Sequence, residues 1–279
     1  MKLEKQHTCH GGTIEYYSHE SEQTKTPMRF SLFVPEGAGA DIPYVLFLSG
    51  LTCTEDNFTT KAGAYKKAAE LGLAVLAPDT SPRGEDVPDN DAYDLGKGAG
   101  FYIDATQEPW ADNYRMESYI MKELLPKAEK KFALDSKNKS IMGHSMGGHG
   151  ALTLYFKYPD AFKSVSAFSP IVAPTQVPWG QKAFAAYLGD NRAEWNAHDA
   201  CELVHRAEDV EDNAQILIDQ GLGDDFLEEQ LKPELFEQAC KDAGQRLKLR
   251  QHKGYDHSYF FIQSFIDDHL EHHKEYLEQ

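Results

Sequence analysis

The pattern of hydrophobic and polar positions divides the chain into an alternating beginning and a longer part with continuous apolar runs. Residues 28–34 partly alternate and end at the turn residues Pro35-Glu36-Gly37, and residues 12–18 also have strand character. Alternation of this kind is typical of antiparallel strands with one exposed face. We therefore expect these two segments to form an antiparallel edge of a sheet.

Short continuous apolar runs follow, and the intervals between them are long enough to hold helices. The runs are residues 44–48, 73–77, 139–142, 165–168, 215–219 and 247–251. Apolar strands separated by helical stretches predict an α/β fold, with a mostly parallel central sheet covered by helices on both faces. The chain shows neither an internal repeat nor a linker rich in Gly, Ser or Pro, so residues 1–279 are expected to form one domain.

Five segments between these runs have helical character. They are residues 60–71, 114–131, 146–158, 233–243 and 258–277. The fourth has the clearest ends, because Pro233 stands in its first turn and Gly244 follows its last residue. The second contains Pro126, a candidate break, and the last can bury Phe261, Phe265 and Leu270 in one stripe.

Composition and charge exclude several classes of protein. Of 279 residues, 41% are hydrophobic and 26% charged, which is typical of a globular chain with a large core. The net charge of −17 opposes nucleic-acid binding. Apolar runs stay short of the roughly 20 residues of a membrane helix, and residues 1–10 have no apolar signal core. We therefore expect a cytoplasmic protein that binds neither nucleic acid nor membranes, with its four cysteines reduced.

The motif G-x-S-x-G occurs once, at residues 143–147, with Ser145 at its centre. Residues 140–142 have the character of a strand end, and residues 148–152 that of a helix start. A nucleophile elbow needs this passage from strand to turn to helix, and its sharp turn requires the small neighbours that the two glycines provide. Ser145 is therefore predicted to be a nucleophile at the positive end of a helix.

A serine hydroxyl needs a base, and we predict His257 for this role. It follows the last expected strand and precedes the last helix, as the order Ser, Asp or Glu, then His requires. His252 is the nearest alternative. Two other groups of histidines are expected to have non-catalytic roles. We expect His144 and His149 to pack beside the motif. The last expected helix carries His269, His272 and His273, which we expect to lie on its solvated face and not to bind a metal.

The acid that orients the base is expected in the loop after residues 215–219. Asp219, Asp224 and Asp225 are the candidates, and Asp224 is favoured because two preceding glycines give the loop reach. The backbone N–H groups of Leu51 and Met146 are the predicted oxyanion hole, since Leu51 follows a strand end and Met146 follows the nucleophile.

The longer motifs resemble those of one family, the S-formylglutathione hydrolases of the esterase D group, which have the α/β-hydrolase fold. The likeness runs nearly from end to end and rests on residues 49–54, 78–84, 100–106, 143–152, 219–221 and 254–259. The resemblance implies hydrolysis of S-formylglutathione to glutathione and formate in formaldehyde detoxification, with side activity on short-chain esters. It also implies a cytoplasmic location and often a homodimer. We expect neither a cofactor nor a bound metal.

The resemblance also bears on individual residues. The acid of the family matches Asp224, which strengthens that choice. Cys53 matches a cysteine near the active site, where it would control access and take no part in nucleophilic attack. Trp179 and Lys182 match a segment near the pocket. Because glutathione is anionic and the chain itself is acidic, Lys182 is our hypothesis for a local cation that contacts the substrate.

Three alternative functions remain at this point. A general short-chain carboxylesterase would use the same catalytic groups. An acyltransferase on the same fold is a second alternative, although such enzymes act outside the cell. A non-catalytic binding module is the third, although such proteins usually lose one of the three catalytic residues, and all three candidates are present here.

Overall fold

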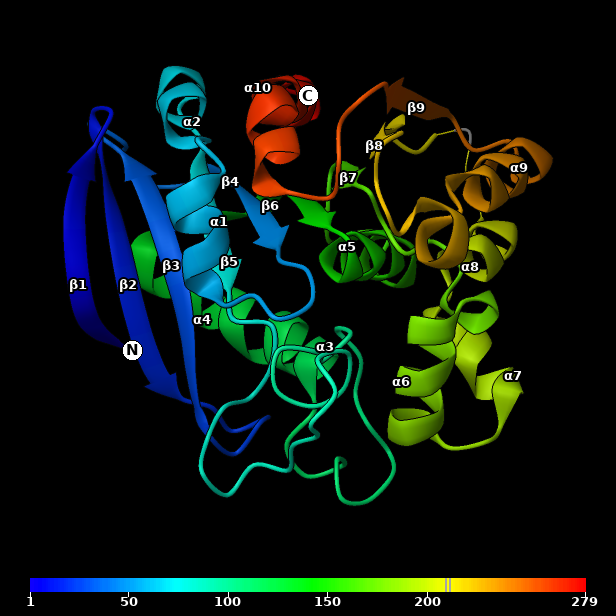
Figure 1. The fold of residues 1–279 in the computed structure, drawn as a ribbon. Helices are drawn as coiled ribbons and strands as arrows, with labels where there is room; N and C mark the ends of the chain where they lie inside the picture. Colours follow the sequence, from blue (N-terminus) through cyan, green and yellow to red (C-terminus); the bar gives the residue numbers. More distant parts are fainter. Residues whose placement is uncertain (209, 211) are drawn as a thin grey trace.

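The computed structural model describes residues 1–208, 210 and 212–279 and contains one central sheet (Figure 1). Within these residues nine strands follow the spatial order β1-β2-β3-β5-β4-β6-β7-β8-β9. Their bounds are β1 Lys2–Cys9, β2 Gly12–Glu20, β3 Pro27–Pro35, β4 Ile42–Leu48, β5 Ala74–Pro78, β6 Leu134–His144, β7 Val165–Phe168, β8 Ile216–Gly221 and β9 Leu247–His252. The first three strands pair antiparallel and β3 pairs antiparallel with β5, whereas β5, β4 and β6–β9 pair in parallel. The predicted fold class is confirmed.

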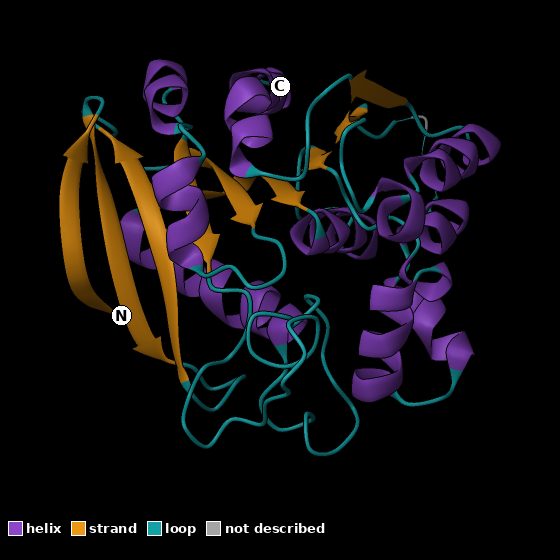
Figure 2. Cartoon of the chain, in the orientation of Figure 1, coloured by secondary structure: helices purple, strands orange, loops and turns teal. Residues whose placement is uncertain are grey.

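Helices cover both faces of this sheet, as Figure 2 shows in purple. The longer ones are α1 Glu55–Lys61, α2 Tyr65–Leu71, α4 Leu125–Phe132, α5 Met146–Lys157, α6 Pro178–Leu188, α8 Ala200–Arg206, α9 Pro233–Ala243 and α10 Tyr259–Leu277. The shorter ones are α3 Met116–Ser118, η1 Tyr119–Leu124, η2 Pro174–Gln176, α7 Arg192–Trp195, η3 Asn196–His198 and η4 Leu227–Leu231. Residues 79–115 form the loops and turns that connect β5 to α3 (Figure 2).

The central strand β4 shows why two helical layers are needed. Its side chains alternate in direction, so Tyr44 and Leu46 enter one apolar cluster while Val45 and Phe47 enter the other. The first cluster is covered by helices that include α5, and the second by α1, α2 and α10. Burial on both faces explains why β4 is a continuous apolar run in the sequence.

Two predicted helices are divided in the structure. The segment predicted at residues 60–71 is two helices, because Gly63 takes a left-handed φ of 70° between α1 and α2. The N-terminus of α1 is a capping box in which the Thr54 hydroxyl accepts the Asp56 N–H. The segment predicted at residues 114–131 changes from α3 to the π-helix η1, and Pro126 stands at the start of α4.

Helix α10 contradicts one expectation about the histidines. We expected His269 and His273 to lie on a solvated face, but both are completely buried. The His269 ring lies within hydrogen-bond distance of Ser166 Oγ, at 2.8 Å, and the two nitrogens of His273 lie 2.8 Å from Ser164 and Ser166. The solvated-face interpretation is therefore wrong for these two residues, because their polar atoms have partners inside the protein.

Candidate active site

Ser145 occupies the turn between β6 and α5 in a strained backbone conformation, with φ of 58° and ψ of −119°. The turn is tight enough to exclude side chains at both motif glycines. A Cβ on Gly143 would lie 2.1 Å from the Gly147 carbonyl oxygen, and one on Gly147 would lie 1.9 Å from the Leu48 carbonyl oxygen. This geometry is that of a nucleophile elbow, since such strain persists only where the surroundings enforce it.

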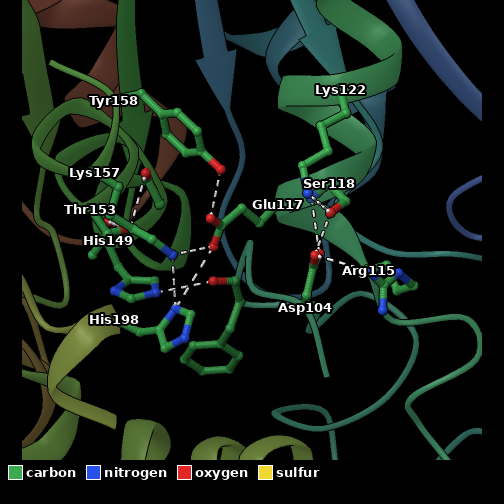
Figure 3. Close-up of polar contacts among 12 residues, drawn as sticks. Asp104, Arg115, Glu117, Ser118, Lys122, His149, Thr153, Lys157, Tyr158 and His198 are labelled. Atoms are coloured by element: carbon green, nitrogen blue, oxygen red, sulfur yellow. Dashed lines mark hydrogen bonds and ion pairs between the residues drawn. The ribbon is translucent and has the colours of Figure 1, made fainter. Parts of the chain in front are cut away.

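Helix α5 places its N-terminus directly after Ser145. Met146 is the first residue of the helix, so its N–H is one of the donors that have no acceptor within the helix. The far end of α5 is anchored by an ion pair between Lys157 and Glu117 of α3, and Tyr158 also donates to Glu117 at 2.9 Å (Figure 3). These two contacts with Glu117 hold the C-terminal end of α5.

His257 and Asp224 come together from two loops. His257 lies between β9 and α10, Asp224 follows β8, and Nδ1 of the imidazole lies 2.5 Å from Asp224 Oδ2. The carboxylate is buried and its Oδ1 accepts the Phe226 N–H at 2.9 Å, while Gln220 Nε2 approaches Oδ2 only to 3.5 Å. A carboxylate on Nδ1 leaves Nε2 of the imidazole able to accept a proton.

The alternative candidates for base and acid lie elsewhere. Asp219 accepts two hydrogen bonds of 2.5 Å from Arg250, and His252 lies 3.2 Å from the same carboxylate. Burial raises the pKa of Asp219, but bonds from His269 and Arg250 outweigh it and hold that pKa below its usual range. Asp225 is exposed. The geometry therefore pairs His257 with Asp224 and assigns Asp219 to an internal ion pair.

A cavity of about 230 Å³ opens beside Ser145. It is lined by Gly50, Leu51, Thr52, Cys53, Tyr93, His144, Ser145, Trp179, Phe226 and His257. The structure thus brings the predicted Leu51, Cys53 and Trp179 to one space with Ser145 and His257. Lys182 lies outside this lining, and its Nζ pairs with Asp94 at 2.5 Å. A substrate contact by Lys182 stays a prediction.

Tyr93 and Phe226 also line the cavity, and sequence reasoning did not single them out. The Tyr93 hydroxyl accepts the indole N–H of Trp179 at 3.0 Å, and the Phe226 ring centroid lies 4.7 Å from that of Trp179. Phe226 also lies 5.1 Å from the His257 ring. Only its place two residues after Asp224 could have pointed to Phe226, whereas Tyr93 belongs to a long loop without a recognisable motif.

The histidine of the elbow, His144, is buried with its ring centroid 4.4 Å from that of His257. Burial, and to a lesser degree the neighbouring His257, hold the pKa of His144 well below its usual range. Burial likewise raises the pKa of the Cys53 thiol. Both groups are therefore uncharged near neutral pH, which agrees with the packing role expected for His144.

The Leu51 N–H lies in the loop between β4 and α1. Among the described residues it has no backbone acceptor, whereas Thr52 N–H donates to the Gly98 carbonyl at 2.9 Å. A donor without a protein acceptor at a cavity wall is available to a ligand. The predicted Leu51 and Met146 donors thus both lie beside Ser145.

Two further observations concern metal binding and membrane-spanning helices. In residues 1–208, 210 and 212–279, we find no group of three or more His, Cys, Asp or Glu side chains placed to bind a metal ion. In the same residues, every helix is too short or too polar to span a bilayer.

Comparison with known proteins shows the family to which the chain belongs. The family model for Esterase matches residues 21–272. The chain is 49% identical to an S-formylglutathione hydrolase from Agrobacterium tumefaciens, with a TM-score of 0.96 and coverage of 99% of this chain and 100% of that chain.

More distant structures share the fold. A fluorophosphonate-binding serine hydrolase from Staphylococcus aureus is 18% identical with a TM-score of 0.74, over 94% of this chain and 98% of that chain. A ferulic acid esterase from Anaeromyces mucronatus is 20% identical with a TM-score of 0.65, over 95% of this chain and 91% of that chain. The chain therefore belongs to the esterase family, together with the S-formylglutathione hydrolase of Agrobacterium tumefaciens, and it is a hydrolase of the α/β-hydrolase fold.

Proposed function

We propose that this protein hydrolyses the thioester S-formylglutathione to glutathione and formate, and acts more weakly on short-chain esters. The observation that carries the proposal is 49% identity over 99% of the chain with a hydrolase of that substrate. The pairing of His257 with Asp224 at a cavity that also contains Ser145 supports the same chemistry.

In the proposed first step, His257 Nε2 takes the proton from Ser145 Oγ as this oxygen attacks the formyl carbon. Asp224 stabilises the imidazolium and holds the ring in the required tautomer. The negative charge that develops on the formyl oxygen is bound by the N–H groups of Leu51 and Met146. The carbon–sulfur bond then breaks, and the sulfur leaves as the thiol of glutathione with the proton from His257.

The second step removes the formyl group from the enzyme. His257 takes a proton from water as the water oxygen attacks the formyl-serine carbonyl. The bond between the carbonyl carbon and Ser145 Oγ breaks, the serine oxygen receives the proton from His257, and formic acid leaves and ionises to formate in solution. Each step ends with His257 neutral, so one base serves both halves of the cycle.

The size of the cavity supports a short acyl group. Its volume of about 230 Å³ is below the usual range for sites that enclose larger ligands, about 300–1,000 Å³. We propose that Cys53 and Trp179 form part of the wall around the formyl group and that Lys182 contacts the anionic glutathione moiety. The neutral Cys53 thiol fits a wall residue better than a nucleophile.

The test compares kcat/KM for S-formylglutathione with kcat/KM for p-nitrophenyl acetate. We expect a large preference for the thioester, and we expect Ser145→Ala to abolish both activities. Ser136→Ala is the matched control, because it changes an exposed serine near the start of β6, the strand that ends directly before Ser145. Comparable values for the two substrates would favour the general short-chain carboxylesterase, and activity retained in Ser145→Ala would refute the nucleophile assignment.

We also propose that the chain is a single domain that works in the cytoplasm as a homodimer, with small molecules as its only substrates. The family resemblance supports the location and the assembly, and the net charge of −17 opposes nucleic-acid partners. Light scattering coupled to size-exclusion chromatography tests the assembly. A mass near twice 31.4 kDa is expected, and a mass near 31.4 kDa at all concentrations would contradict the dimer.

A further inference from the structure

Two successive buried residues beside the active site, Phe101 and Tyr102, have left-handed backbone angles. Their φ values are 50° and 54°, and their exposed fractions are 0% and 1%. This conformation is unfavourable for residues that carry a Cβ, and two in succession require firm support from the surroundings. Neither residue takes part in the proposed hydrolysis steps, so another role must account for this costly conformation.

Two hydrogen bonds connect this pair to the loop that carries Leu51 and to the helix α5 that follows Ser145. The Tyr102 hydroxyl donates to the Ser49 carbonyl at 2.8 Å, and His149 Nε2 lies 3.0 Å from the Phe101 carbonyl oxygen. Because a carbonyl oxygen only accepts, the proton of this histidine is on Nε2; Figure 3 shows His149 and the dashed line of the bond. Burial lowers the pKa of His149 to about 3, so the ring stays neutral at working pH.

The nucleophile helix is shaped to receive the tyrosine ring. Gly150 lies inside α5, where glycine is normally unfavourable because of its backbone entropy. A Cβ at this position would lie 2.6 Å from Tyr102 Cδ2. The ring of Tyr102 therefore occupies the space that a side chain at residue 150 would need, and it rests directly on the backbone of α5.

The loop that receives the hydroxyl bond carries the Leu51 N–H. This N–H lies between the Ser49 carbonyl, which is bound by Tyr102, and the Thr52 N–H, which donates to Gly98. Residues 98 and 102 thus hold the loop on both sides of the donor. A backbone donor fixed on both sides loses less freedom when it binds developing charge, which is the condition for an effective oxyanion hole.

We propose that Tyr102 is a positioning residue that couples the oxyanion loop to the nucleophile helix. Its ring is seated on Gly150, and its hydroxyl fixes the loop that presents the Leu51 N–H. The carbonyl of the preceding residue, Phe101, is bound by His149 of the same helix. The two oxyanion donors then keep their spacing, because Tyr102 ties the loop that carries Leu51 to α5, the helix that carries Met146. The proposal depends on the proposed function only in taking Leu51 as an oxyanion donor.

The variant Tyr102→Phe removes the hydroxyl and keeps the ring. Complete removal of an oxyanion donor costs about 10²–10³ in kcat, so a donor that is merely loosened should cost about 10-fold or more. For p-nitrophenyl acetate we expect this fall in kcat with KM within about twofold. Affinity for an aryl trifluoromethyl ketone, which forms a tetrahedral adduct with serine, should fall by the same factor as kcat/KM.

Tyr114→Phe is the matched control. Tyr114 is also 1% exposed and donates to a backbone carbonyl, that of Pro88 at 2.6 Å, but outside the oxyanion loop. Its kcat should stay within about twofold of wild type. The proposal is overturned if both tyrosine variants lose kcat equally, or if Tyr102→Phe loses kcat while its affinity for the ketone is unchanged.

A second pair of variants keeps the test independent of the folding of Tyr102→Phe. His149→Gln can still donate to the Phe101 carbonyl, whereas His149→Leu cannot. We expect the first to retain more of kcat and of ketone affinity than the second, and equal losses would contradict the coupling. Because all assays use an ester, a wild-type protein inactive on S-formylglutathione would refute the proposed function and leave this test unaffected.

Discussion

Replacing Asp224 by Asn tests how this carboxylate acts on His257, because the structure determines which way the new amide faces. Asp224 Oδ1 accepts the Phe226 N–H at 2.9 Å, and Oδ2 lies 2.5 Å from His257 Nδ1. A backbone N–H needs an oxygen acceptor, so the amide oxygen of Asn takes the Oδ1 position and its NH₂ group faces His257. The imidazole then accepts at Nδ1 and carries its proton on Nε2.

An imidazole protonated on Nε2 cannot take the proton from Ser145. In a triad this change of tautomer lowers kcat about 10⁴-fold, which corresponds to about 5 kcal/mol of transition-state stabilisation. Since Asn has nearly the shape of Asp, KM and the melting temperature should change little. The assay is steady-state hydrolysis of p-nitrophenyl acetate, with Ser145→Ala as the background rate.

Asp225→Asn is the matched control, because Asp225 is the neighbouring residue and is exposed. It removes the same charge within the same loop and should leave kcat within about twofold of wild type. A loss in Asp225→Asn equal to that in Asp224→Asn would refute the tautomer argument, since a general effect of loop charge would then explain both. Wild-type activity in Asp224→Asn would remove Asp224 from the mechanism.

Three further predictions concern stability and the thiol. Arg250→Met should lower the free energy of unfolding by about 3–5 kcal/mol at pH 7, since it leaves the buried Asp219 without its cation. The folded-state pKa of Asp219 is depressed, so the stability that this ion pair contributes is present above about pH 4 and is lost as pH falls below it. Urea unfolding at pH 7 and below about pH 4 should therefore show a smaller difference between wild type and Arg250→Met in acid. Gly147→Ala should destabilise by about 3 kcal/mol or more, because its Cβ would lie 1.9 Å from the Leu48 carbonyl oxygen, and an unchanged urea midpoint would contradict the geometry. Cys53→Ala should keep kcat within about threefold of wild type. Because burial raises the pKa of the Cys53 thiol, iodoacetamide should inactivate the wild-type protein more slowly than it alkylates free cysteine. Inactivation faster than the alkylation of free cysteine would contradict this prediction.

Elements with a strong local pattern could be predicted from the sequence closely. The strand Val165–Phe168 and the helix Pro233–Ala243 have the predicted bounds, because apolar runs, Pro at a first turn and Gly after a last turn act over a few residues. The strand β1 was missed because almost all of its side chains are exposed, so it carries no apolar alternation. Its place in the sheet comes from backbone pairing with β2, which side-chain pattern does not reveal.

The candidate site also has a part that the sequence predicted and a part that only the tertiary structure decided. The elbow around Ser145 is local, since its glycines and the following helix adjoin the serine, and the sequence alone was enough to predict it. The sequence ranked three aspartates for the acid by spacing and resemblance, but only the tertiary structure brought Asp224 to His257 and bound Asp219 to Arg250.

Tertiary packing also decided what no local pattern could indicate. The burial of His269 against Ser166 and the bond from Tyr102 to Ser49 each join residues more than 50 positions apart. Periodicity reports which way a side chain faces along its own element, but the partner of a polar group depends on which other elements pack there. The sequence thus predicted the apolar strands and the elbow around Ser145, and the three-dimensional packing of the sheet, its helices and its loops determined how the polar groups pair.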